Sequence, residues 1–440
     1  MLTLRYLVRL IRAFLTRFKG ILFLSFALGI LSFVILNLLG PTLLSRSTKK
    51  IGITGRFRTD NLPDFIINNV SDGLTKLDES GVVEPSLASS WETPDKGKTW
   101  FFYLRDDIYW QDGKKVTSET IGYDFSDVEI ETPDEKTVIF KLSNAFSPFP
   151  TVVSKPTFKK GLLGTGEWRV KNITVAGGYV QELVLTNKEE GKIIYRFYPT
   201  EERAKLAYKL GHVDRLINIY DPTPLDSWKS VEIVKESNDN QVVSIFFNVQ
   251  DKYLSEKSLR QALVYAIDKE SFDGERAYGP LSPTSWGYNP QVKTYGYDES
   301  RAKELIEELD EEQTKDLEIK LLTTPILLPT AERIAKYWEA IGVKTVLQVS
   351  SGVPADYQAL LAVFEIPKDP DQYSIWHSTQ SSTNISNYQD PRIDKLLEDG
   401  RAELTILERS KVYLDFQRYL VEDSPAAFIY HPTSYTVNRK

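Results

Sequence analysis

The first 50 positions have the most uneven distribution of apolar and charged residues in the chain. Residues 20–44 contain no charged side chain, and about 20 apolar residues suffice for a helix to cross a hydrocarbon layer of roughly 30 Å. The preceding residues 1–19 are basic, with Arg5, Arg9, Arg12, Arg17 and Lys19. Because such a flank favours a cytoplasmic N-terminus, we expect residues 20–44 to form a transmembrane anchor.

Two alternatives remain open for this region. A cleaved signal peptide competes with the anchor, although the apolar stretch is long and no small-x-small cleavage motif follows it. Arg46, Lys49 and Lys50 also follow the stretch closely, which weakens the charge asymmetry. Residues 1–19 are interpreted either as a basic amphipathic flank on anionic lipid or as a simple topogenic segment.

From residue 51 onwards the pattern predicts an α/β body. Alternating apolar positions predict strands near residues 100–105 and 137–142, and a further strand at 344–349. Helical spacing and capping signals predict helices near residues 201–210, 259–267, 299–309, 331–341 and 406–420. Asp298 and Thr330 are expected to cap the third and fourth of these helices, and Thr405 with Glu408 has the spacing of a capping box.

Two apolar segments, 242–248 and 424–432, are expected to cross between two lobes. Lobe I then comprises residues 51–241 plus 430–440, and lobe II comprises residues 242–429. Two crossings make a hinge that closes by small backbone rotations.

Composition excludes several kinds of chemistry. The chain has 440 residues and no cysteine, which excludes disulfides, zinc–thiolate sites, cysteine nucleophiles and a lipid-modified cysteine. The net charge of -7 argues against nucleic acid as a partner. The three histidines, at 212, 377 and 431, are scattered, and no nucleophile elbow or phosphate-binding loop occurs. We therefore expect no catalysis, no cofactor and no metal.

Seven short segments carry a resemblance to a known family. The two most specific are EPSLASSWETPDKGKTWFFYLRDDIYWQDGKKV (84–116) and LRQALVYAIDKESF (259–272). The others are NVSDGL at 69–74, GTGEW at 164–168, GHVD at 211–214, DPDQYSIWHSTQ at 369–380, and NISNY with DPRID at 384–394. In their order along the chain, these segments resemble the extracytoplasmic solute-binding proteins of peptide-class ABC importers, family 5. Taken alone, GTGEW is most simply a tight turn with φ > 0, and the second segment a core-packed helix.

The resemblance implies an α/β, two-lobed fold of the periplasmic-binding-protein type II class, here preceded by one transmembrane helix. It implies an extracytoplasmic monomer, held here by the anchor expected at residues 20–44, that captures an oligopeptide or similar extended solute and delivers it to an ABC permease with its ATPases. A solute sensor or envelope binding protein without a transporter is one alternative. A membrane-anchored hydrolase is another.

Two departures from the family pattern affect these expectations. Only a short segment lies between Glu119 and Pro133, which predicts a reduced small lobe. Peptide-binding members often have an aspartate four residues before the proline of the DPD segment, and that position is Ile366 here. The neighbouring Glu365 is expected to bind the ligand's ammonium instead.

The candidate ligand contacts cluster after the apolar run at residues 360–364. Carboxylates there suit a cationic group, aromatic side chains suit the walls of a cleft, and amides and hydroxyls suit a peptide backbone. Each residue also has a structural interpretation as a turn or core residue. The candidates are Glu365, Asp369, Asp371, Tyr373, Trp376, His377, Ser378, Gln380, Asn384 and Tyr388, with Trp110 from lobe I as a residue that closes over the ligand.

Overall fold

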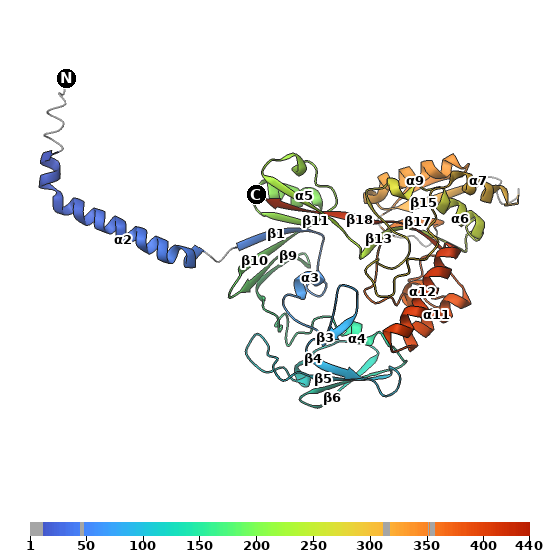
Figure 1. The fold of residues 1–440 in the computed structure, drawn as a ribbon, viewed down its shortest axis with the longest axis horizontal. Coiled ribbons are helices and arrows are strands. Elements are labelled where there is room, and N and C mark those ends of the chain that lie inside the picture. Colours follow the sequence, from blue (N-terminus) through green and yellow to red (C-terminus); the bar gives the residue numbers. More distant parts are fainter. Residues whose placement is uncertain (1–11, 45–47, 311–316, 351, 353–356) are drawn as a thin grey trace, which may run out of the picture.

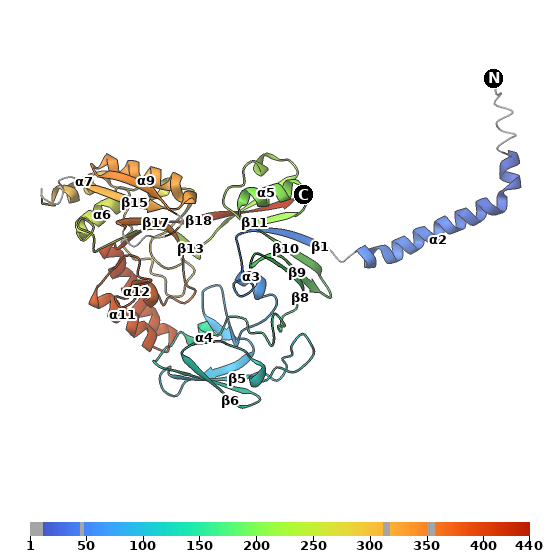
Figure 2. The ribbon, with the colours of Figure 1, turned by 180° about the vertical axis from the view of Figure 1, so that it is seen from behind.

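An N-terminal helix stands apart from a two-lobed body (Figures 1 and 2). The computed structural model describes residues 12–44, 48–310, 317–350, 352 and 357–440. Residues 1–11 of the predicted basic flank therefore lie outside the described residues.

Helix α2 (Lys19–Leu44) coincides with the predicted anchor and projects away from the body. The side chains of residues 22 and 34–44 are not among those described. In the part of the chain that the structure describes, no helix combines the length and apolar character needed to cross a membrane. The anchor and its flank stay predictions.

A twelve-stranded sheet runs through both lobes. Its strands are β1 (Thr48–Thr54), β8 (Arg169–Ala176), β9 (Tyr179–Asn187), β10 (Gly191–Tyr198), β11 (Arg215–Ile219), β12 (Val231–Ser237), β13 (Gln241–Phe247), β14 (Gly274–Arg276), β15 (Glu318–Thr323), β16 (Lys344–Val349), β17 (Ala359–Glu365) and β18 (Ala426–Arg439). The main path is β16-β15-β17-β13-β18-β11-β1-β10-β9-β8, and β12 and β14 also pair with β18.

Strand β18 belongs to both lobes. Its residues 426–430 pair with β13, and its residues 433–439 pair with β12. β12 runs into β13 through a turn in which the backbone N–H of Gln241 donates to the backbone carbonyl of Asn238 (3.0 Å). Two strand connections thus link the halves of the sheet, as Figure 1 shows. The lobe boundaries themselves stay a proposal, which these pairings support.

Lobe II packs helices on both faces of its strands. Its helices are α6 (Lys257–Tyr265), α7 (Glu299–Glu307), α9 (Leu328–Ala340), α10 (Tyr373–Trp376), α11 (Pro391–Ala402) and α12 (Ile406–Asp423). Successive β13 residues point to opposite faces. Phe247 meets Trp338 of α9 on one face (ring centroids 6.3 Å apart), and Phe246 meets Trp376 of α10 on the other (5.9 Å). We call these the α9 face and the Trp376 face.

Helix starts follow the predicted caps, with one exception. The Asp298 side chain accepts from the Arg301 amide, and the Thr405 side chain accepts from the Glu408 amide. The prediction for Thr330 is wrong, because α9 begins at Leu328 with Pro329 in its first turn. Proline is well suited to this place since its missing N–H has no helical partner there. The Thr330 hydroxyl instead lies 3.3 Å from the Tyr430 hydroxyl.

Lobe I contains a smaller α/β part and a separate small lobe. The first part packs α3 (Asp64–Ile67) and α5 (Glu201–Lys209) around β1 and β8–β12. The small lobe comprises β2 (Thr75–Leu77), β3 (Val83–Pro85), β4 (Ala88–Glu92), β5 (Thr99–Leu104), the 3-10 turn η1 (Ser118–Thr120), β6 (Val128–Asp134), β7 (Thr137–Leu142) and α4 (Phe149–Val152). Its four-stranded sheet, β4-β5-β7-β6, has an aromatic core of its own that includes Trp100, Phe102, Phe140 and Phe149. Further 3-10 turns are η2 (Leu225–Ser227), η3 (Lys269–Ser271) and η4 (Pro325–Leu327).

The glycines of the GTGEW segment serve close packing rather than a positive φ, so the turn prediction is wrong. Neither Gly164 nor Gly166 has a positive φ. A Cβ on Gly164 would lie 2.1 Å from the Val70 carbonyl oxygen, and one on Gly166 would lie 2.5 Å from the Asn69 carbonyl oxygen. The segment is therefore pressed against the backbone of residues 69–70, which only glycine allows.

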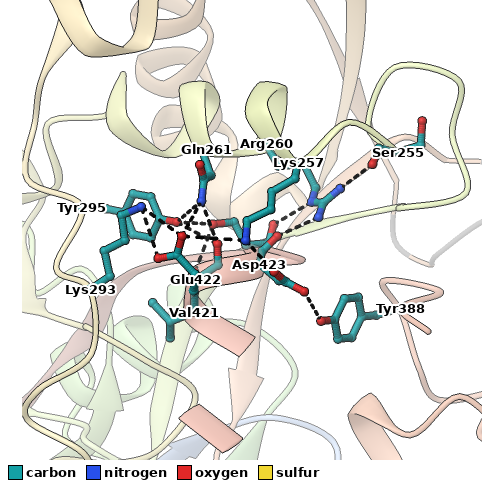
Figure 3. Close-up of polar contacts among 11 residues, drawn as sticks. Ser255, Lys257, Arg260, Gln261, Lys293, Tyr295, Tyr388, Val421, Glu422 and Asp423 are labelled. Atoms are coloured by element: carbon teal, nitrogen blue, oxygen red, sulfur yellow. Dashed lines mark hydrogen bonds and ion pairs between the residues drawn. The ribbon is translucent and has the colours of Figure 1, made fainter. Parts of the chain in front are cut away.

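The second signature segment holds the start of β18 in place (Figure 3). Arg260 is buried and donates to the carbonyl oxygens of Asp423 (2.7 Å) and Ser424 (3.1 Å). Gln261 donates to the Glu422 carbonyl (2.8 Å). Burial lowers the pKa of Arg260, although the nearby Asp423 opposes this shift. The predicted core helix, α6, thus also carries buried polar side chains that tie it to the end of α12.

Candidate ligand-binding site

The two tryptophans predicted as cleft walls lie in protein cores. Trp376 is fully buried, and its indole N–H donates to Gln372 Oε1 (2.8 Å). Trp110 is buried in the small lobe, and its indole N–H donates to Thr120 Oγ1 (3.0 Å). The structure brings neither ring to a described cavity, so ligand contact by them stays an untested prediction.

Asp369 forms a buried two-pronged ion pair with Arg409. Arg409 Nη1 lies 2.9 Å from Asp369 Oδ2, and Nη2 lies 2.5 Å from Oδ1. Burial alone lowers the pKa of Arg409, but the charge and hydrogen bonds of Asp369 raise it overall. Thr151 of the small lobe reaches the same carboxylate at 3.4 Å. The pair fixes the loop after β17 against α12 and the small lobe.

Asp371 positions Arg401 at the edge of α11. Asp371 Oδ2 accepts from Arg401 Nε at 2.9 Å, while burial raises the pKa of Asp371. The Arg401 guanidinium lies 3.9 Å from the Tyr373 ring centroid and 5.1 Å from that of Phe146. Its terminal nitrogens make no hydrogen bond to another described residue. The neighbours of Arg401 thus orient its guanidinium, and its two terminal nitrogens remain available to donate hydrogen bonds.

The remaining candidates on this segment mostly bond to one another or to nearby loops. His377 stacks on Tyr373 with centroids 4.0 Å apart. The Ser378 hydroxyl donates to Asp394 Oδ2 (2.5 Å). The backbone N–H of Gln380 donates to the His377 carbonyl (3.0 Å). Asn384 donates to the Tyr388 carbonyl (2.8 Å). These contacts hold the shape of the loop around α10.

Tyr388 points toward Asp423, at the end of α12. Its hydroxyl donates to Asp423 Oδ2 at 2.7 Å within the network of Figure 3. Burial and this carboxylate raise the pKa of Tyr388. The structure therefore places Tyr388 beside the α6–α12 junction, with its hydroxyl already used.

His377 keeps one nitrogen without a hydrogen bond. Its Nδ1 accepts from the Thr379 amide (3.2 Å), whereas its buried Nε2 has no hydrogen-bond partner among the described residues. Glu398 Oε1 lies 3.5 Å from this Nε2. In the described part of the chain, no group of three or more histidine, aspartate or glutamate side chains is placed to hold a metal ion.

The small lobe contacts lobe II directly. The Trp286 amide donates to the Ser80 carbonyl (3.1 Å), and the Ser147 amide donates to the Arg401 carbonyl (2.8 Å). Gly81 has φ +87°, and a Cβ there would lie 2.3 Å from the Lys368 carbonyl oxygen. The lobes therefore meet at two seams on the Trp376 face.

A cavity of about 360 Å³ lies at one of these seams, and we call it the seam cavity. It is formed by the aromatic edge of the small lobe and by Arg401 of α11. Its lining residues are Phe125, Asp127, Val128, Leu142, Ser143, Asn144, Ala145, Phe146, Phe149, Val152 and Arg401. Aromatic and aliphatic side chains with one oriented cation, Arg401, suit an anionic group on an apolar body, and the lining also carries the Asp127 carboxylate and the polar side chains of Ser143 and Asn144.

A second cavity, of about 430 Å³, lies at the junction of the lobes, and we call it the hinge cavity. Its lining residues are Tyr220, Gln241, Val243, Asp273, Ile326, Leu327, Thr330, Val363, Glu365, Tyr430, Pro432 and Thr433. Gln241 pairs with Glu365 and Val243 pairs with Val363 across β13 and β17, on the same face as Phe247. The hinge cavity is therefore on the α9 face, and Glu365 is separated from residues 369–380.

Sequence reasoning did not find the other charged and aromatic residues of these cavities. Arg401 and Phe146 meet across 255 positions of the chain, and Tyr220 and Asp273 reach one cavity from separate loops. No local spacing connects such residues.

Two α/β lobes that share a crossing strand and enclose cavities at their contacts define a two-lobed binding protein. Residues 82–384 match the family of bacterial extracellular solute-binding proteins, family 5 (Middle). Since this covers more than half of the chain, the chain belongs to that family.

Individual relatives agree with this assignment. The oligopeptide-binding protein AppA of Bacillus subtilis (strain 168) is 24% identical over 458 residues, covering 86% of this chain and 84% of AppA. The crystal structure of NikZ from Campylobacter jejuni with Ni(L-His) has a TM-score of 0.73 at 22% identity, covering 90% and 94% of the two chains. The structure of Bacillus subtilis AppA with a nonapeptide has a TM-score of 0.68 at 22% identity, covering 90% and 95%. These likenesses confirm the two-lobed α/β fold.

Proposed function

We propose that this chain captures a peptide or similar extended solute between its lobes and delivers it to an ABC permease with its ATPases. The observation that carries the proposal is the family match over residues 82–384, combined with the seam cavity where the lobes meet. Relatives named as oligopeptide- and dipeptide-binding proteins support a peptide as the solute.

The proposed contact for the solute's carboxylate is Arg401. Its Nε is held by Asp371 and its guanidinium lies over Tyr373, so the side chain is ordered before a ligand arrives. The terminal nitrogens can then donate two parallel hydrogen bonds to a carboxylate. The phenylalanines of the seam cavity supply the apolar surface for a neighbouring side chain.

Closing of the lobes is proposed to accompany binding. A solute that contacts the small lobe and α11 together favours the arrangement in which both are close. The two strand connections at β12–β13 and β18 supply the hinge. The proposed lobes are residues 51–241 with 430–440, and residues 242–429.

The protein is proposed to act as a monomer on the outer face of a membrane, held by residues 20–44. The absence of charged residues at positions 20–44 supports this placement. An anchored chain should remain with membranes after an alkaline carbonate wash, and release into the supernatant would contradict the anchor.

Native mass spectrometry of the purified full-length chain tests the central claim. A co-purifying peptide, removed by mild denaturation and rebound with micromolar or tighter affinity, is the expected result. Arg401→Gln should reduce rebinding, while Arg418→Gln, which affects an exposed pair with Asp415, is the matched control. Failure of a broad peptide mixture to bind or to raise the melting temperature would contradict the proposal.

A further inference from the structure

The end of lobe I at which β1 begins collects basic side chains. The register of the sheet places the beginnings of β1, β8, β10, β11 and β12 and the ends of β9 and β18 at this one end. We call the described charged residues within two positions of these strand ends the basic face. Its basic members are Lys49, Lys50, Arg169, Lys171, Lys188, Lys192, Arg215, Lys229, Arg439 and Lys440, and its acidic members are Glu167, Glu189, Glu190, Asp214 and Glu232.

The opposite ends of β1 and β8–β12 show no excess of positive charge. Within two positions of those strand ends, the charged residues are Arg56, Arg196 and Lys235 on one side of the balance and Asp221, Glu236 and Asp239 on the other. The chain as a whole has a net charge of -7. The positive charge is therefore a local property of the basic face, and it opposes the charge of the rest of the protein.

Internal ion pairs do little to neutralise the basic face. In the described part of the chain, Arg439 is the one basic member with an ion pair, to Asp214 at 4.0 Å. Lys188 and Lys229 are exposed to solvent. Trp228, the neighbour of Lys229, is also 37% exposed, and tryptophan is favoured at the level of lipid headgroups. Clustered cations beside an exposed indole suit an anionic lipid surface.

The basic face lies next to the proposed anchor. Three residues, 45–47, separate the end of α2 from the start of β1, so β1 begins within about 14 Å of the end of that helix. Figures 1 and 2 show the start of β1 and the C-terminus on the side of the body that faces α2. A helix that spans the membrane therefore brings the basic face close to the headgroups. Anionic headgroups attract lysine and arginine there over a Debye length of about 8 Å.

We propose that the basic face is a membrane-contact surface that binds anionic phospholipid headgroups and lays lobe I against the bilayer. The inference rests on the anchor of the proposed function, to which it adds an electrostatic attachment. Figure 1 shows α11, which carries Arg401, on the far side of the body from the start of β1. Contact through the basic face thus leaves the seam cavity on the side away from the bilayer.

Lysine acetylation by a membrane-impermeant reagent tests this contact on the full-length chain in vesicles. Phosphatidylcholine vesicles are compared with vesicles of equal parts phosphatidylcholine and phosphatidylglycerol. Lys188 and Lys229, which are remote from the anchor in sequence, should react about threefold or more slowly in the anionic vesicles. The difference should disappear in 1 M sodium chloride, where the Debye length is about 3 Å.

Lys336 on α9 is the internal control for this measurement. It is exposed and lies outside the basic face, so its rate of acetylation should be the same in both kinds of vesicle. Normalising to Lys336 also corrects for molecules whose body faces the vesicle interior. Equal normalised rates for Lys188 and Lys229 in the two kinds of vesicle would overturn the membrane contact.

Charge reversal separates the basic face from a general effect of net charge. A variant with Lys49→Glu, Lys188→Glu and Lys192→Glu should lose the protection of Lys229 by phosphatidylglycerol. The matched control reverses the exposed Lys96, Lys320 and Lys336, which gives the same net charge, and should keep that protection. Protection of Lys229 that persists in the first variant, or disappears equally in both, would overturn the assignment to this face.

Flotation distinguishes a failure of this inference from a failure of the proposed anchor. A full-length chain that does not float with phosphatidylcholine vesicles lacks the anchor. The basic face then still predicts flotation with the phosphatidylglycerol vesicles at low salt and release in 1 M sodium chloride. A chain that floats with neither kind of vesicle would overturn both the anchor and the membrane contact.

Discussion

The two faces of the sheet that joins the lobes use their charged groups differently. On the Trp376 face, Asp369 is bound twice by Arg409 and Asp371 is bound by Arg401. On the α9 face, Glu365 has a single hydrogen bond from a neutral amide. Charges of the first face mainly fix the loop after β17, whereas Glu365 on the second face is exposed to solvent. Proximity to a signature segment is therefore a poor guide to which carboxylate is available.

The largest expected effect comes from breaking the buried pair on the Trp376 face. Arg409→Met should lower the free energy of unfolding by about 3–5 kcal/mol, because Asp369 would be left buried without its partner. Guanidinium denaturation followed by tryptophan fluorescence measures this change. Arg418→Met on the exposed face of α12 should stay within about 0.5 kcal/mol, and equal effects of both changes would refute a structural role for the buried pair.

A smaller effect is expected from the packed GTGEW segment. Gly164→Ala should cost about 1–3 kcal/mol, because the added Cβ meets the Val70 carbonyl oxygen and the backbone must move. Gly122→Ala is the control, since its nearest contact would be at 3.4 Å. Thermal unfolding of the two variants side by side separates close packing from a general loss of glycine.

Substitutions on the two faces should also differ in their effect on the protein's affinity for peptide. Arg401→Gln should weaken tri-alanine binding about tenfold, the cost of a lost charge-assisted hydrogen bond. Glu365→Gln should change the tri-alanine affinity less than twofold. Calorimetry on both variants decides, and a large loss in the Glu365 variant alone would move the solute to the α9 face.

The smallest expected effect is a pH dependence at Asp371. Burial raises the pKa of this carboxyl in the folded state, so its ionised form destabilises the fold above its unfolded pKa of about 3.9. As pH falls through the raised pKa, protonation removes that cost. The difference in unfolding free energy between wild type and Asp371→Asn should therefore shift in favour of wild type from pH 7 to pH 4. An unchanged difference would show that Arg401 compensates the burial fully.

Local patterns predicted much of the fold, because they report on single elements. The caps at Asp298 and Thr405 depend on residues three positions away, and both predictions are confirmed. The strands at residues 100–104 and 137–142 follow directly from apolar alternation and are also confirmed. Thr330 failed as a cap because Pro329 had already started the helix.

The candidate site was less predictable, since its properties depend on distant partners. Nothing near Asp369 in the sequence shows that Arg409 will pair with it. An aromatic side chain such as that of Trp376 suits a cleft wall as well as a core. Only the packing of Phe246 against it shows that it belongs to the core. Gly164 similarly depends on the backbone at Val70, 94 positions earlier.

The sharing of β18 has a consequence for biosynthesis. This strand leaves the ribosome after all of lobe II, yet β11 and β12 of lobe I pair with its second half. Those early strands must wait with unpaired backbone edges until residues 433–439 have been made. Lobe I therefore completes its folding last, although most of it is translated first, and a chaperone that protects open strand edges would act chiefly on this lobe.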